Sequence, residues 1–178
     1  MEAAPDEALM LAYKEGNAGA FETLYSRHRR RLYRFVLRAV KTRGVAEELF
    51  QEIWMRVIEA RSRYTPQARF TTWLYTIAHN HLVDHWRKRG LTLVALDGEE
   101  LAAADPDPAD EAQARQSLAR FAAALEALPA LQREAFLLHE EGGLSIAEIA
   151  AATGANEEAA KSRLRYAISK LKAALADE

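Results

Sequence analysis

The residues best suited to chemistry lie in one stretch, residues 79–85, which holds three of the five histidines of the chain. His81 and His85 are four residues apart, a spacing that places two imidazoles on one face of a helix, and Asp84 lies beside them. Such a set could bind a metal ion that activates water for hydrolysis. His79 and His81, however, point in different directions on a helix, and no His-Glu-x-x-His pattern is present. This stretch therefore lacks the third ligand and the general base that a metal-dependent hydrolase needs, and we predict no metal site.

The surrounding residues combine aromatic, amide and basic side chains, and this mixture suits the binding of nucleic acid. Aromatic faces can hold unstacked bases while amide groups contact base edges and cations follow the phosphates. The mixture favours single-stranded or melted nucleic acid over an intact duplex. The alternative is that some of these aromatic residues, with Leu74 and Ile77, only build the core. The residues concerned are Tyr64, Arg69, Phe70, Trp73, Tyr75, His79, Asn80, His81, His85, Trp86, Arg87, Lys88 and Arg89.

A second group of polar residues lies near the carboxyl end of the sequence, in a helix-turn-helix pattern. Ser145 and Glu148 form a capping box, S-x-x-E, that opens a short helix. Gly154 follows this helix, and Asn156 can cap a longer one that extends to about Leu175. Two helices joined by a short turn with glycine match the motif whose second helix enters the major groove of DNA.

The longer helix of this pattern is amphipathic. Its apolar face would pack against neighbouring helices, and its polar face would be available for contact with phosphates and base edges. The alternative is a helical hairpin whose Lys and Arg are merely solvated. The apolar face holds Ala160, Leu164, Ala167, Ile168, Leu171 and Leu175, and the polar face holds Lys161, Ser162, Arg165, Ser169 and Lys172.

Helices are the only elements that the sequence supports, because no stretch shows sustained alternation of apolar and polar residues. The expected fold class is therefore all-α. We predict helices over residues 6–15, from Asn17 to about Thr42, and over residues 45–61, 71–89, 111–128, 130–140, 146–152 and 157–175.

The charge distribution divides the chain into two modules joined by an acidic segment. Residues 21–92 carry fifteen Lys and Arg against six Asp and Glu, whereas residues 93–111 carry seven acids and no base. The acidic segment also contains two prolines and few residues that could pack. We therefore predict one small helical domain over residues 1–92, a flexible acidic linker over residues 93–111 and a second small helical domain over residues 112–178.

The composition excludes several classes of function. The chain has no cysteine, so it has no disulfide, no thiolate metal site and no cysteine nucleophile. No apolar run approaches the ~18 residues of a membrane span. The acidic amino terminus lacks the basic and apolar regions of a signal peptide. We therefore expect a cytoplasmic protein without membrane insertion.

Five motifs, in the expected order, resemble a known family over nearly the whole chain. N-x-x-A-F-E-x-L-Y-x-x-H (17–28), A-E-E-L-x-Q-E (46–52) and F-x-T-W-L-Y-x-I-A-x-N-x-x-x-D (70–84) resemble region 2 of bacterial sigma factors. L-S-x-x-E-I-A (144–150) and K-S-R-L (161–164) resemble their region 4. Because only these two regions are present, joined by a short acidic linker, the chain resembles the minimal extracytoplasmic-function (ECF) class.

The resemblance implies a transcription initiation factor that binds core RNA polymerase and directs it to promoters. The helix after Val45 would dock on the clamp helices of the largest polymerase subunits through Glu48, Gln51, Glu52 and Met55. The segment over residues 64–89 would melt and read the promoter −10 element, with one non-template base flipped into a pocket near Asn80. The acidic linker would lie in the polymerase cleft.

The resemblance assigns DNA contacts to both modules. The −10 residues would be Arg69, Trp73, Tyr75, His79, Asn80, Arg87 and Lys88, and the −35 residues would be Lys161, Ser162, Arg165 and Tyr166. The implied partners are core RNA polymerase, promoter DNA and an anti-sigma factor, with no cofactor and no catalytic residue. Two alternatives are a stand-alone helix-turn-helix regulator that binds duplex DNA unaided and a helical adaptor with no role on nucleic acid.

Overall fold

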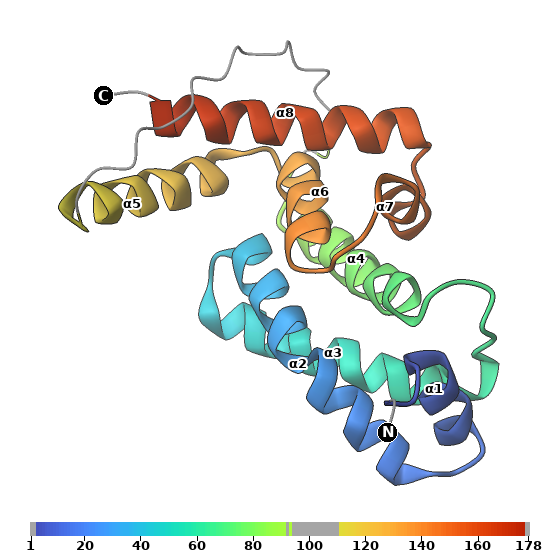
Figure 1. Cartoon of the computed structure of the whole chain (residues 1–178). Coiled ribbons are helices and arrows are strands. Elements are labelled where there is room, and N and C mark those ends of the chain that lie inside the picture. Colours follow the sequence, from blue (N-terminus) through green and yellow to red (C-terminus); the bar gives the residue numbers. More distant parts are fainter. Residues whose placement is uncertain (1–2, 92, 94–110, 177–178) are drawn as a thin grey trace.

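The chain is helical through most of the residues that the computed structural model describes, which are 3–91, 93 and 111–176. Figure 1 shows α1–α3 at one end of the molecule, α5–α8 at the other, and α4 between them. No strand occurs in the described residues, and the all-α prediction is confirmed. The elements are α1 (Asp6–Lys14), α2 (Ala18–Val40), α3 (Arg43–Ala60), the 3-10 turn η1 (Arg61–Arg63), α4 (Phe70–Lys88), α5 (Glu111–Ala127), α6 (Ala130–Glu140), α7 (Ile146–Thr153) and α8 (Glu157–Ala176).

Helix α2 is the centre of the N-terminal module, because α1, α3 and α4 all pack against it. Asn17, at the predicted start of this helix, caps its first turn, since the side-chain oxygen accepts a hydrogen bond from the N–H of Ala20 at 3.2 Å. The inward face of α2 is apolar, and its Leu24, Leu32 and Phe35 have no exposed surface. Burial of side chains of this size stabilises the fold by about 1.5–3 kcal/mol each.

Aromatic rings join α3 to α2. Trp54 packs edge-on against Tyr25, with ring centroids 5.1 Å apart, and against Phe21 at 5.9 Å. Edge-to-face pairs of this kind contribute about 0.5–1.5 kcal/mol beyond the area that they bury. This packing fixes the face of α3 that turns away from α2.

The C-terminal module is built around α8, which packs against α5, α6 and α7. Its predicted apolar face is buried at Ala160, Leu164, Ala167 and Leu171. The capping box at the start of α7 is present as predicted. Gly154 ends α7 in the left-handed region, at φ +68°, a backbone conformation that residues with a Cβ seldom adopt.

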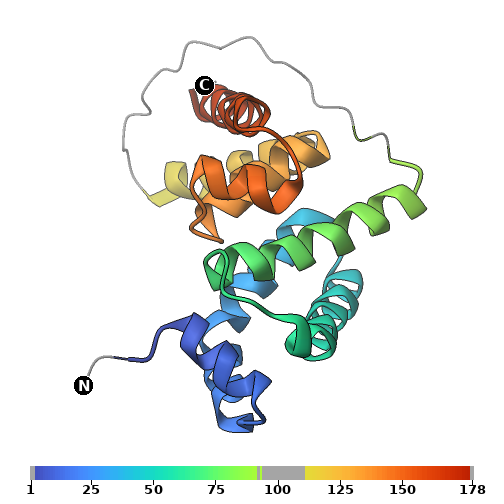
Figure 2. The same cartoon turned by 90° about the vertical axis from the view of Figure 1, so that its right-hand side faces the viewer.

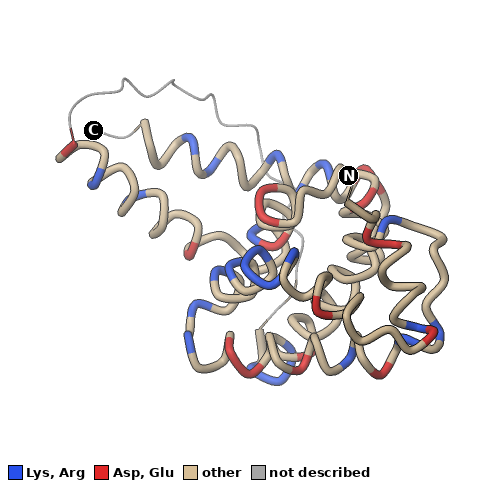
Figure 3. The backbone as a smooth tube through the Cα atoms, turned by 60° about the horizontal axis from the view of Figure 1, so that its bottom comes forward, with Lys and Arg blue, Asp and Glu red and all other residues tan. Residues whose placement is uncertain are grey.

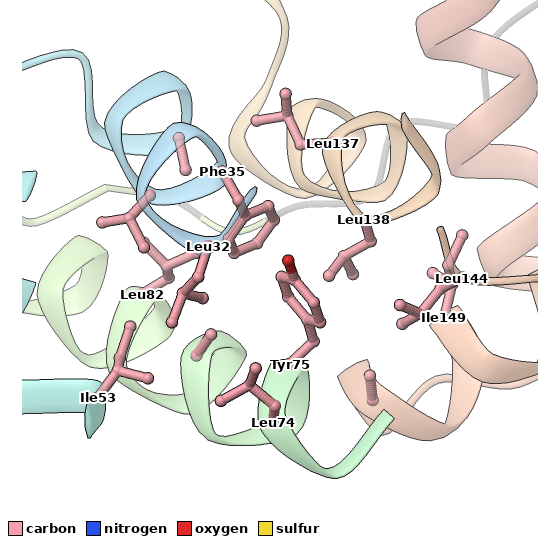
Figure 4. Close-up of a cluster of buried hydrophobic side chains, with 14 of the residues drawn as sticks. Leu32, Phe35, Ile53, Leu74, Tyr75, Leu82, Leu137, Leu138, Leu144 and Ile149 are labelled. Atoms are coloured by element: carbon pink, nitrogen blue, oxygen red, sulfur yellow. The ribbon is translucent and has the colours of Figure 1, made fainter. Parts of the chain in front are cut away.

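The two modules contact each other along α4 and α2. Helix α4 packs against α7, and α2 packs against α6. Figure 2 shows the same junction from the side, with α4 running beneath the C-terminal helices. Figure 4 shows Tyr75 of α4 between Phe35 of α2 and Leu138 of α6, within one apolar cluster that includes residues of both modules. The charge pattern of the sequence gave no indication of this shared core.

The predicted linker over residues 93–111 lies almost entirely outside the described residues. Leu93 is half-buried and packs against the apolar cluster, and Glu111 is the first residue of α5. The domain boundaries and the flexibility of this segment therefore stay predictions.

Candidate nucleic-acid interface

Helix α4 carries the residues predicted to read the −10 element, and the structure divides them into two sets. Asn80, Arg87 and Lys88 are exposed, and the two cations lie in the last turn of α4, where the helix dipole favours positive charge. Trp73 is half-buried and packs edge-on against Tyr64, with ring centroids 5.0 Å apart. These residues present cationic, amide and aromatic groups on one helix, as nucleic-acid binding requires.

The other predicted −10 residues are engaged by the C-terminal module. Tyr75 is buried, and burial holds the pKa of its hydroxyl well above the ordinary value. His79 is also buried, and its Nδ1 makes a short hydrogen bond with the Oε1 of Glu134 in α6. Arg69 is exposed but lies 3.5 Å from the carboxylate of Glu148 in α7. In this arrangement Tyr75 and His79 are not available to DNA.

The four residues predicted to bind polymerase lie on one face of α3. Their spacing of three and four residues places them in line on a helix, and all four are exposed. Together with α4 they form a groove of about 650 Å³. The groove is lined by Glu48, Gln51, Glu52, Met55, Arg56, Glu59, Ile77, Asn80, His81 and Asp84.

This groove is acidic, because it holds four carboxylates against one arginine. Its negative charge suits a partner surface rich in Arg and Lys. Met55, with 55% of its surface exposed, adds an apolar contact in the middle of the polar residues. Burial, together with Arg89, lowers the pKa of the His85 imidazole, and Glu48 and Glu52 oppose this shift.

The helix-turn-helix has the geometry predicted from its sequence. The Oδ1 of Asn156 accepts a hydrogen bond from the N–H of Ala159 at 2.8 Å, which caps α8. Arg165 is exposed, while Lys161, Ser162 and Tyr166 are half-buried. Figure 3 shows Lys and Arg positions along the length of α8. The helix therefore presents basic side chains opposite the face that packs in the C-terminal module.

Two histidines of α4 contact other groups of the protein. His79 is bonded to Glu134, and Nδ1 of His81 lies 3.0 Å from the carbonyl oxygen of Ile77 in its own helix. Among the residues that the structure describes, no group of three or more His, Cys, Asp or Glu could hold a metal ion.

Two glutamates of the C-terminal module and two arginines of α2 have contacts that the sequence did not predict. Glu141 lies 3.1 Å from Nε of Arg34 and 2.8 Å from an Nη of Arg38. Glu148 accepts a hydrogen bond from the hydroxyl of Thr72 at 3.0 Å in addition to its contact with Arg69. These partners are 76 to 107 residues apart, and no local pattern indicates such contacts. Only the capping-box role of Glu148 was evident from the sequence.

None of the helices in the described residues is both long and apolar enough to cross a membrane.

Two family models match the chain in the positions that the motifs indicate. Residues 24–92 match the model of sigma-70 region 2, and residues 118–171 match the model of sigma-70 region 4. The chain is 35% identical over 171 residues to the RNA polymerase sigma factor CarQ of Myxococcus xanthus, which covers 94% of this chain and 96% of CarQ. It is 34% identical to the ECF RNA polymerase sigma factor BldN of Streptomyces coelicolor, over 97% of this chain and 68% of BldN.

Two solved structures share this fold. CnrH, in complex with the cytosolic domain of CnrY, superposes with a TM-score of 0.72 at 27% identity, over 97% of this chain and 99% of CnrH. The sigma factor RpoE of Bartonella quintana, in complex with the anti-sigma factor NepR, gives a TM-score of 0.67 at 26% identity, over 89% of this chain and 98% of RpoE. With both sigma-70 regions in order and relatives that match along nearly the whole chain, this protein belongs to the ECF class of the sigma-70 family, the transcription initiation factors that direct RNA polymerase to promoters.

Proposed function

We propose that the three surfaces of this chain divide the work of promoter recognition. The acidic groove between α3 and α4 docks on core RNA polymerase, α4 melts and reads the −10 element, and α8 reads the −35 element. The domain limits of 1–92 and 112–178 follow from this division, and the extents of the two family matches support them.

The observation that carries the proposal is the groove. Glu48, Gln51, Glu52 and Met55 line one depression that stays exposed while the opposite face of α3 is buried in the core. A helix that packs with one face and presents acidic and amide groups with the other is suited to a second protein. This surface favours a polymerase-dependent factor over a stand-alone helix-turn-helix regulator, which needs no such groove.

The chemistry of α4 supports its role on melted DNA. Trp73 offers an aromatic face, Asn80 an amide and Arg87 a cation, which are the groups that bind unpaired bases and their phosphates. On α8, Lys161, Ser162, Arg165 and Tyr166 would contact the −35 duplex. Neither surface catalyses a reaction, and the polymerase carries out the chemistry.

We further propose an anti-sigma factor as a regulatory partner and the cytoplasm as the place of action. CnrH was solved in complex with the cytosolic domain of CnrY, and RpoE in complex with the anti-sigma factor NepR. A factor that binds core polymerase must act where that polymerase acts.

A charge-reversal pull-down tests the docking surface. Glu52→Lys and Gln51→Lys should each reduce retention of the chain on immobilised core polymerase about tenfold or more, because both place a cation in an acidic groove. Glu22→Lys, at an exposed position of α2, is the matched control and should bind as the unsubstituted chain does. Unchanged retention of both groove variants would remove this face from polymerase binding.

A further inference from the structure

Aromatic side chains lie along the contact between α2 and α3, and a row of residues there belongs to none of the three surfaces described above. Tyr25, Arg29 and Tyr33 are spaced by four residues, so they lie in line on one side of α2. Phe50 of α3 contacts both tyrosines, with its ring centroid 6.4 Å from that of Tyr25 and 5.5 Å from that of Tyr33. We call these four residues the aromatic–arginine patch.

The aromatic–arginine patch is open to solvent in this structure. Tyr25, Tyr33 and Phe50 are half-buried, so part of each ring faces solvent, and Arg29 is exposed. The described residues that line the acidic groove include none of the patch, although both surfaces use α3. Docking through the groove therefore does not occupy the patch.

The part of the chain around the patch is strongly cationic. Residues 23–46, which include most of α2, carry eight Lys and Arg and no Asp or Glu. Some arginines of α2 pair with carboxylates of the protein, as Arg27 does with Asp6 at 3.0 Å. Arg29 and Arg30, in contrast, make no ion pair with any residue that the structure describes. Their charge is therefore available to an anionic ligand.

This combination of rings and arginines fits an unpaired nucleic-acid strand. Aromatic faces stack on bases of any sequence, while arginines follow the phosphates and also stack on bases. Tyr25 and Tyr33 are separated by about 12 Å along the helix axis, which is the length of about three nucleotides of a stacked strand. A purely acidic protein segment would match the charge but would give the rings no stacking partner.

We propose that the aromatic–arginine patch binds single-stranded DNA, as a site separate from α4. The proposal does not rest on the −10 role of α4, because every residue of the patch lies on α2 or α3. Tyr25 and Tyr33 stack on bases, and Arg29 contacts a phosphate between them. Because these four side chains include no amide or carboxylate that reads base edges, binding is independent of base sequence.

Photocrosslinking to the full chain tests where the strand binds. A short oligodeoxythymidine with iodouracil bases, which couple to aromatic rings on irradiation, should form adducts at Tyr25 or Tyr33. Mass spectrometry of the digested protein locates them. The same strand annealed to its complement should form few adducts at these positions, because its bases stay stacked in the duplex. Adducts confined to α4 and α8 would overturn the proposal.

The affinity for the same strand, measured by fluorescence anisotropy at several salt concentrations, tests the role of Arg29. Arg29→Gln, at an exposed position, should weaken binding about threefold or more. It should also reduce the slope of log affinity against log salt by about 0.7, the value for one phosphate contact on a single strand. Arg43→Gln removes an exposed cation of the same module outside the patch and should leave both quantities unchanged. Equal affinity and slope for Arg29→Gln and the unsubstituted chain would overturn the proposal.

A further variant and a competitor separate single-stranded DNA from an acidic protein ligand. Tyr33→Leu keeps an apolar side chain against Phe50 but removes the ring, and it should weaken binding of the strand about fivefold or more. Unlabelled strand should displace the probe at a concentration about tenfold or more below that of polyglutamate of equal charge. Displacement by both competitors at equal concentration would show a site for any polyanion and would overturn the proposal.

Discussion

Glu148 shows how one residue can serve both local and tertiary structure. Its carboxylate accepts a hydrogen bond from the N–H of Ser145 at 3.1 Å and thereby completes the capping box of α7. The same carboxylate accepts the hydroxyl proton of Thr72 and lies near Arg69. Burial alone would raise the pKa of Glu148, but these hydrogen bonds and Arg69 lower it below its ordinary value. The charged form is therefore the one that the folded chain favours.

This lowered pKa predicts a pH dependence of stability. The contribution of Glu148 is present above the ordinary value of 4.5 and is lost as pH falls through the lowered value of the folded chain. Glu148→Gln, which keeps a residue type suited to the capping box, should lower the free energy of unfolding at about pH 6 by about 1 kcal/mol. The difference from the unsubstituted chain should shrink toward about pH 3. Denaturant titrations across this range measure it, with Glu140→Gln as control; a constant difference would contradict the assignment.

Arg165 is the residue of α8 for which the sharpest prediction can be made. It is exposed on the polar face, and a base-edge contact from arginine is worth about 1–3 kcal/mol of discrimination, whereas a phosphate contact weakens all sequences alike. Arg165→Ala should reduce transcription from a cognate promoter and change the preference at one or two −35 positions. Lys172→Ala, further along α8, should have a smaller effect that is independent of sequence. Transcription from randomised −35 elements decides between them, and an unaltered preference profile would exclude Arg165 from base readout.

At the scale of elements, local signals predicted most helix starts and tertiary contacts explain the exceptions. Asn17, Asn156 and the Ser145 capping box act within three residues, so the sequence alone located these three helix starts correctly. Helix α4 begins at Phe70, one residue before the predicted start, and has no side-chain cap from Arg69. Its first N–H instead donates to Oε1 of Glu7, 63 residues earlier, at 2.8 Å. No helix-start pattern could reveal a cap that another helix supplies.

The Glu7 cap predicts a measurable stability effect. Glu7→Ala leaves the N–H of Phe70 without its partner and should lower the free energy of unfolding by about 1 kcal/mol. Amide exchange in the first turn of α4 should accelerate at the same time. Glu22→Ala, at an exposed site on α2, is the control for removal of a carboxylate. Equal stability of the two variants would show that water replaces the cap at no cost.

The sequence predicted the exposed face of α3 correctly but not the burial of part of α4. Both outcomes follow from what helical periodicity can report. The groove residues of α3 lie on one helix face because of their spacing, so the sequence alone was enough to group them. The burial of Tyr75 and His79 depends on α6, which lies across the junction, and sequence could not indicate it. Helical periodicity reports what lies on one face but not which helix covers that face.

At the scale of the whole molecule, the junction predicts how the chain responds to cleavage. The acids and prolines of residues 93–110 favour proteolysis there rather than within the helices. Because the modules share a core and the ion pairs of Glu141 with Arg34 and Arg38, the two fragments should remain together in gel filtration at low salt. Glu141→Gln should weaken this association, because it removes the carboxylate that pairs with Arg34 and Arg38. High salt should weaken the same pairs, since both arginines are about half exposed. Immediate separation of the unsubstituted fragments at low salt would contradict a stable junction.

The central claim, that this chain gives promoter choice to RNA polymerase, is tested most directly by reconstituted transcription. Core polymerase would be incubated with sheared genomic DNA, with and without the protein, and transcript 5′ ends would be mapped. With the protein, transcripts should start at discrete sites that share −35 and −10 sequences, and core polymerase alone should show no such set. Glu52→Lys should abolish this set, because it blocks docking rather than DNA reading. An identical pattern of 5′ ends with and without the protein would contradict the account.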